Sequence, residues 1–174
     1  MVNNKSRKVV LIVFSSLLFL VSCASNSNQQ VDGGSTTPDV TETAQANSSE
    51  ISVFVDKEGR AIRGTDPVAY FTQGSPVAGK AEFTHEWSGA TWLFATAENR
   101  DLFAASPEQY APQYGGFCAW AVSQGNTAPI DPQAWTIVNG KLYLNFSKGI
   151  QRRWEQDIPG NIAKANSNWP SILK

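Results

Sequence analysis

The sequence has few of the residues that build metal and redox centres. Its 174 residues include two cysteines, Cys23 and Cys118, and one histidine, His85. Structural zinc sites take four protein ligands and catalytic zinc sites take three, so Cys118 and His85 make an incomplete site by themselves. If Cys23 is modified, Cys118 is the only thiol left, which excludes an intramolecular disulfide. The fold must then be held together by packing.

Positive charge is scarce outside the N-terminus. The formal net charge is −1, and residues 1–22 hold three of the 14 basic residues and none of the 15 acidic ones. Without that segment, 11 basic residues face 15 acidic residues, which gives a net charge of −4. Arg152-Arg153 is then the one basic pair, and it fits a solvated helix face. We expect no nucleic-acid binding, because no basic stripe is present to neutralise phosphates.

Two common catalytic patterns are also absent. Gly115-Gly116 lacks the strand, glycine-rich loop and helix that form a nucleotide-binding loop. A glycosidase or an aspartic protease needs a catalytic pair of carboxylates. The sequence offers no such pair among Asp66, Glu82, Glu86 and Asp131.

The N-terminus carries an apolar run, residues 9–21, behind three basic residues. A membrane-spanning helix needs about 20 apolar residues, so this run fits a cleaved export signal better. It ends in Leu20-Val21-Ser22-Cys23, which resembles the cleavage site of a bacterial lipoprotein signal. The resemblance implies that residues 1–22 are a signal peptide and that Cys23 is acylated after cleavage. An ordinary signal peptide with an incidental cysteine, or a short anchor, is the alternative.

This resemblance also implies a location. The protein would be exported and held in the bacterial cell envelope by the lipid on Cys23, with the membrane as a partner. Ala24 and Ser25 stand where an aspartate typically retains such proteins in the inner membrane, so the outer membrane is favoured if two membranes are present. Residues 23–50 are polar and contain no aromatic residue. They predict a disordered tether, because they cannot bury enough surface to offset the entropy of ordering.

The remaining residues, 51–174, predict one α+β domain. They contain all six tryptophans, all four tyrosines and seven of the nine phenylalanines, which is ample material for a single core. Ser88-Gly89 and Asn139-Gly140 each lie between two apolar runs and predict two β-hairpins. We therefore expect a small antiparallel sheet of hairpins packed with several short helices, with a first strand at residues 51–56. Helix starts are predicted at Asp66-Pro67, Thr96, Ser106-Pro107 and Ser147.

Several motifs of this region occur together. They are residues 66–71 (DPVAYF), 89–94 (GATWLF), 97–103 (AENRDLF), 114–118 (YGGFC), 157–161 (DIPGN) and 168–170 (NWP). The set resembles the YHS domain family, and in particular its longer, exported branch. The resemblance covers nearly everything after residue 60 and implies a membrane-anchored binding module for a metal ion or a small ligand.

The chain departs from this family where metal chemistry is concerned. Shorter YHS modules, often attached to metal transporters and oxygenases, typically carry cysteines at the positions of Ala69, Ala95 and Asn99. Thiolates select copper(I) or zinc, so that metal chemistry does not carry over to this chain. The remaining candidate ligands for copper or zinc are His85 and Cys118, completed by Asp66, by water or by a second protomer.

His85 and Cys118 each have two interpretations. Strand alternation places His85 on one face with Phe83 and Trp87, where it is either a core histidine or a ligand or acid/base group. Cys118 lies near a predicted helix start, which would favour its thiolate. Its apolar neighbours fit a buried, inert thiol equally.

Three functions stay open. The first is the YHS-type binding module, with Trp87, Trp92 and Trp120 as candidate pocket walls, although core packing would also account for these tryptophans. The second is a thiol-dependent enzyme or redox protein that uses Cys118 and His85. The third is a structural or partner-binding lipoprotein.

Overall fold

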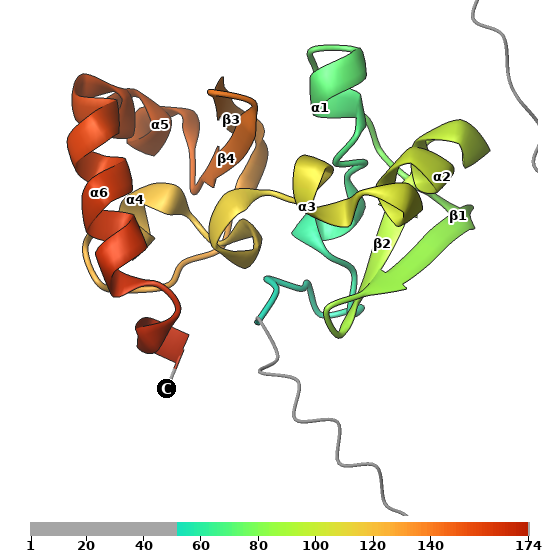
Figure 1. Ribbon diagram of the computed structural model, residues 1–174, viewed down its shortest axis with the longest axis horizontal. Coiled ribbons are helices and arrows are strands. Elements are labelled where there is room, and N and C mark those ends of the chain that lie inside the picture. Colours follow the sequence, from blue (N-terminus) through green and yellow to red (C-terminus); the bar gives the residue numbers. More distant parts are fainter. Residues whose placement is uncertain (1–51, 174) are drawn as a thin grey trace, which may run out of the picture. The chain divides into compact units, whose positions relative to one another are not determined.

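Two β-hairpins with two-residue turns form the strands of the domain (Figure 1). The computed structural model describes residues 52–173. Strand β1 (Lys80–Trp87) pairs antiparallel with β2 (Ala90–Phe94), and β3 (Asp131–Val138) pairs antiparallel with β4 (Lys141–Asn145). The predicted signal peptide, Cys23 and the predicted tether lie outside the described residues. In the described part of the chain, no helix has both the length and the apolar character needed to cross a membrane.

Both turns have the backbone geometry that a tight hairpin needs. The φ angles are 50° and 73° in Ser88-Gly89 and 51° and 73° in Asn139-Gly140. Positive φ at both central residues matches the twist of the flanking strands and favours Asn-Gly. Both predicted hairpins are therefore confirmed.

The hairpins form two separate two-stranded sheets, whereas the sequence predicted one small sheet. The edge of β2 is already occupied, because the Ala61 amide donates to the Thr91 carbonyl over 2.9 Å. The predicted first strand is also wrong for residues 52–56, where the pairing is one isolated bridge between Val55 and Ala61. The Phe54 amide instead donates to the Gly115 carbonyl. This segment thus packs against a loop and not into a sheet.

Short helices connect and cover the hairpins. Side-chain caps begin three of them: Thr96 accepts from the Asn99 amide and Ser147 from the Ile150 amide, as predicted, and Asp157 caps a third helix. The helices are α1 (Ala69–Thr72), α2 (Ala97–Ala105), α3 (Pro107–Tyr110), α4 (Ala119–Ser123), α5 (Lys148–Trp154) and α6 (Ile158–Asn168). Turns of 3-10 helix lie at η1 (Ile62–Gly64), η2 (Gln113–Gly116), η3 (Glu155–Asp157) and η4 (Ser171–Leu173). The α+β fold class is therefore confirmed.

Aromatic side chains fill two buried clusters. The first contains Trp92, Phe94 and Phe103, which join the β1–β2 hairpin to α2. The second contains Tyr143 and Trp154, whose ring centroids lie 5.2 Å apart. Figure 1 shows α3 between these regions, with β1 and β2 on one side and α4 and α6 on the other. The chain linking the two clusters runs through α3 and η2, which also form the candidate site.

Candidate functional site

A cavity of about 430 Å³ lies beside α3 and η2. Its volume falls within the roughly 300–1,000 Å³ that is typical of small-molecule sites. Its lining comes from both strands of the first hairpin, from α3 and η2, from Val53 and from the end of α6. The aromatic side chains that line it are Trp87, Trp92, Tyr114 and Trp169.

Trp87 and Trp92 form one wall. They stand on adjacent strands, and their ring centroids lie 5.8 Å apart. The Trp92 indole N–H donates to the Trp87 carbonyl over 3.1 Å, so the buried indole is satisfied. Phe103 of α2 supports both rings, at centroid distances of 5.8 Å from Trp87 and 5.0 Å from Trp92. Packing against Phe103 therefore holds both tryptophan rings of this wall in place.

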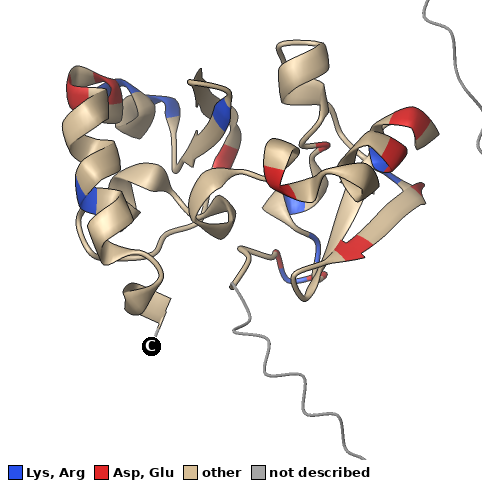
Figure 2. Cartoon of the chain, in the orientation of Figure 1, with Lys and Arg blue, Asp and Glu red and all other residues tan. Residues whose placement is uncertain are grey.

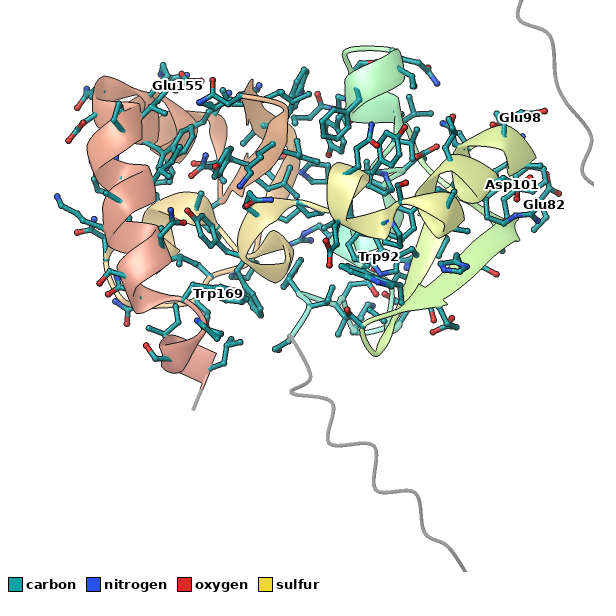
Figure 3. All side chains as sticks on the ribbon, in the orientation of Figure 1. Glu82, Trp92, Glu98, Asp101, Glu155 and Trp169 are labelled. Carbon is teal, nitrogen blue, oxygen red and sulfur yellow. The ribbon has the colours of Figure 1, made fainter. Side chains whose placement is uncertain are left out.

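Tyr114 and Trp169 form the other wall, from η2 and the C-terminal end of α6. Their ring centroids lie 6.0 Å apart, and the Tyr114 hydroxyl donates to Asn166 Oδ1 over 2.9 Å. Burial raises the pKa of Tyr114, so its hydroxyl stays protonated as a donor. Figure 3 shows Trp92 beside β2 and Trp169 at the end of α6. The cavity therefore joins parts of the chain that are far apart in sequence.

The loop at η2 has an unusual backbone that places Tyr114. Tyr114, Gly115 and Gly116 all have positive φ, at 57°, 60° and 82°. A Cβ on Gly115 would collide with the Ser52 carbonyl oxygen, and a Cβ on Gly116 would lie 2.7 Å from a methyl carbon of Ile62. Glycine is needed here because other residues would add both steric conflict and backbone strain.

Glu108 is the only charged residue among those that line the cavity, and it is exposed on α3. Gln113 and Asn166 are the uncharged polar residues of the lining. None of the ion pairs found within residues 52–173 involves Glu108. The cavity thus combines aromatic faces with a single acidic group.

Asp66, a predicted ligand, is fully buried and holds the backbone together. Its Oδ1 accepts from the amides of Val68 and Ala69 over 2.8 and 3.3 Å. Its Oδ2 accepts from the Ala95 amide over 2.8 Å and from the Asn99 side-chain amide over 2.7 Å. Four hydrogen bonds satisfy both oxygens, so this carboxylate ties α1 to the end of β2 and to α2.

The positions that carry cysteines in shorter YHS modules converge on this carboxylate. Ala69, Ala95 and Asn99 each donate one of its hydrogen bonds, although they are distant in sequence. Two of them lack a donor side chain and the third supplies an amide, so these residues do not fit a thiolate metal site. In this chain the hydrogen bonds around the Asp66 carboxylate occupy that position.

His85 lies on the half-buried face of β1 with Phe83 and Trp87, as strand alternation predicted. Its ring centroid lies 6.1 Å from that of Phe103 in an edge-on arrangement. His85 is not among the residues that line the cavity, although its strand neighbour Trp87 is.

Cys118 is 1% exposed and directly precedes α4. Its sulfur accepts from the Phe146 amide over 3.3 Å and lies 3.7 Å from Asn145 Oδ1. Burial raises the pKa of the Cys118 thiol, which keeps it protonated near neutral pH. Trp120, the third predicted wall residue, lines a separate cavity of about 290 Å³ together with Cys118.

His85 packs edge-on against Phe103, whereas the Cys118 sulfur contacts Asn145 and the Phe146 amide. Within residues 52–173, no group of three or more His, Cys, Asp or Glu side chains is arranged to hold a metal ion. The copper or zinc site at His85 and Cys118 stays a prediction.

Sequence reasoning found one wall of the cavity and missed the other. Trp87 and Trp92 were singled out, whereas Glu108, Tyr114 and Trp169 were not. Two signals were present, because Tyr114 begins the YGGFC motif and Trp169 lies in the NWP motif. What the sequence did not show is that these two motifs meet.

Comparison with known proteins identifies part of the chain. Residues 68–114 match the family model of the YHS domain. The match begins just before α1 and ends at Tyr114, so it includes one wall of the cavity and Glu108 but not Trp169. Neither the curated proteins nor the solved structures contain a match to this chain.

Proposed function

We propose that the YHS domain of this chain and the helices that follow it form a module that binds a small organic ligand. The protein is exported and held at the membrane by a lipid on Cys23. The observation that carries the binding proposal is the cavity between the two tryptophan-bearing walls. It has the size, the apolar lining and the few polar groups typical of a ligand site.

The construction of the walls supports binding. Trp92 is buried and supported by Phe103, and Tyr114 is held by its hydrogen bond to Asn166. A ligand would therefore meet surfaces that are already ordered, which lowers the entropic cost of association.

The two other functions have less support. A thiol-dependent enzyme needs an accessible, activated thiolate, and Cys118 is buried with a raised pKa. A purely structural lipoprotein would have no need for two aromatic walls around a hollow, because core aromatics normally pack without voids.

The test uses N-phenyl-1-naphthylamine, a neutral probe that fluoresces in apolar sites. We expect its emission to rise on titration into the purified full chain. Trp169→Ala removes part of a wall and should weaken binding about ten-fold, as truncation of a buried aromatic anchor does. Trp120→Ala is the matched control, because this residue lines the other cavity. An unchanged emission, or equal binding by the Trp169→Ala variant, would contradict the proposal.

A further inference from the structure

The charge of the cavity lining indicates which charge a ligand should carry. This inference rests on the proposed function, in which the cavity binds a small organic ligand. The one charged side chain in its lining is the Glu108 carboxylate, and the lining includes neither Lys nor Arg. Figure 2 shows acidic and no basic colour on α3, the helix that carries it. An anion would meet repulsion here, whereas a cation would be attracted.

The aromatic faces point to the same class. Four rings from two separate walls, Trp87 with Trp92 and Tyr114 with Trp169, line the hollow. The face of an indole or phenol ring attracts a cation within about 6 Å of its centroid, and Trp does so best. A lining that contains three tryptophans and one carboxylate thus favours a positively charged ligand over a neutral one of the same shape.

The polar groups of the lining indicate what kind of cation fits. Primary ammonium and guanidinium groups carry several N–H donors that need acceptors when they lose water. Within the lining, the Asn166 carbonyl oxygen is already bonded to the Tyr114 hydroxyl, which leaves the Gln113 side chain and the exposed Glu108 carboxylate as side-chain acceptors for these several donors. A quaternary ammonium group has no N–H and makes no such demand, and its methyl groups suit an apolar hollow.

From these three observations we infer that the cavity between the two aromatic walls binds a quaternary ammonium ligand, with Glu108 as its counter-ion. This goes beyond the size and shape argument of the proposed function, since it assigns a charge to the ligand. Because Glu108 is exposed, its contribution is screened by salt, and the rings carry the larger share of the selectivity.

The test compares choline with 3,3-dimethylbutan-1-ol, its neutral isostere, in calorimetric titrations of the purified full chain. We expect choline to bind about five-fold tighter or more. Glu108→Gln should weaken choline binding about three-fold at low salt and leave the alcohol unaffected. Trp169→Leu keeps an apolar wall but removes one ring, so it should reduce the preference for choline.

Each outcome decides the inference. Equal binding of choline and the alcohol would overturn the quaternary ammonium assignment and leave the cavity as a site for neutral ligands. If neither compound binds while N-phenyl-1-naphthylamine does, the assignment is again wrong and the proposed function stands. If the naphthylamine also fails to bind, the proposed function fails together with the assignment. Glu108→Lys provides a second variant on the exposed helix face, and at low salt it should reduce the preference for choline more than Glu108→Gln does.

Discussion

At the scale of single residues, Asp66 shows how one side chain can hold α1, the end of β2 and α2 together. A buried carboxylate is tolerated only when hydrogen bonds replace its lost hydration. Here, donors from α1, from the end of β2 and from α2 do so. Its place in the DPV motif therefore has a structural explanation that needs no ligand.

Removing one donor should cost stability. Asn99→Ala leaves Asp66 Oδ2 with the Ala95 amide alone, and we expect the free energy of unfolding to fall by about 1–3 kcal/mol. Urea denaturation measures the change. Asn126→Ala is the control, because that side chain is exposed on a loop and should change stability by less than about 0.5 kcal/mol. Equal effects of the two substitutions would refute the role of the Asp66 network.

Cys118 should be unreactive in the folded protein. Burial raises the pKa of its thiol, so the thiolate fraction is small near neutral pH and increases only as the pH approaches that raised value. We expect alkylation by iodoacetamide at pH 7.5 to be at least about 100-fold slower than in urea, because reaction waits for opening of the structure. The rate is measured by mass spectrometry. Similar rates with and without urea would show that the thiol is accessible and would revive the enzyme hypothesis.

At the scale of elements, the 3-10 turn η2 sets the position of the second wall. Its run of three positive φ angles turns the chain sharply before α4. The Gly115 carbonyl accepts from the Phe54 amide over 2.9 Å, which fixes the N-terminal segment against the same turn. The loop thereby connects Val53 and Tyr114 on the cavity lining.

Two glycines with positive φ allow the cost of backbone strain to be measured separately from the cost of a steric conflict with an added Cβ. Gly115 and Gly140 both have positive φ, but a Cβ would meet the Ser52 carbonyl at Gly115 and nothing within 4 Å at Gly140. Gly140→Ala should therefore cost about 1 kcal/mol from backbone strain alone. Gly115→Ala should cost clearly more and should also weaken binding of the naphthylamine probe. Thermal unfolding and probe titration check both, and equal losses in the two variants would contradict this role for η2.

At the scale of the whole molecule, the proposed lipid anchor would set where the domain acts. Cys23 lies outside the described residues, so the anchor is argued from the signal sequence alone. The polar residues 24–50 would give the domain a reach on the order of 30 Å from the membrane.

Substitution of the anchor residue tests this arrangement. Cys23→Ala removes the proposed lipid attachment point. When the variant is expressed in a bacterial host, we expect that no protein is both cleaved at the signal and bound to the membrane. Each buried CH₂ of an acyl chain contributes about 0.8 kcal/mol to the free energy of membrane binding. Loss of the acyl chains should therefore release the protein from the membrane. Cell fractionation with immunoblotting measures the distribution, and Ser25→Ala serves as the control. A membrane-bound Cys23→Ala protein that still loses its leader would disprove the lipoprotein assignment.

The sequence by itself determined several local features of this protein: a hairpin turn, two helix starts and the face of a strand. Asn139-Gly140 predicts its hairpin because few dipeptides adopt two positive φ angles in a row. Thr96 and Ser147 predict helix starts because their side chains satisfy backbone amides a few residues away. The face of His85 also follows from strand alternation. Each of these depends on contacts that are close in the chain.

Only the tertiary structure decided which distant segments meet. Residues 52–56 alternate like a strand but pack against η2, because Ala61 already pairs with Thr91 along the edge of β2. Trp169 completes a cavity whose other wall is formed by Trp87 and Trp92. Periodicity and capping say which face of an element is apolar and where it ends, but not which partner covers that face. That choice is made by the summed packing of the whole domain, and it is what creates the candidate binding site.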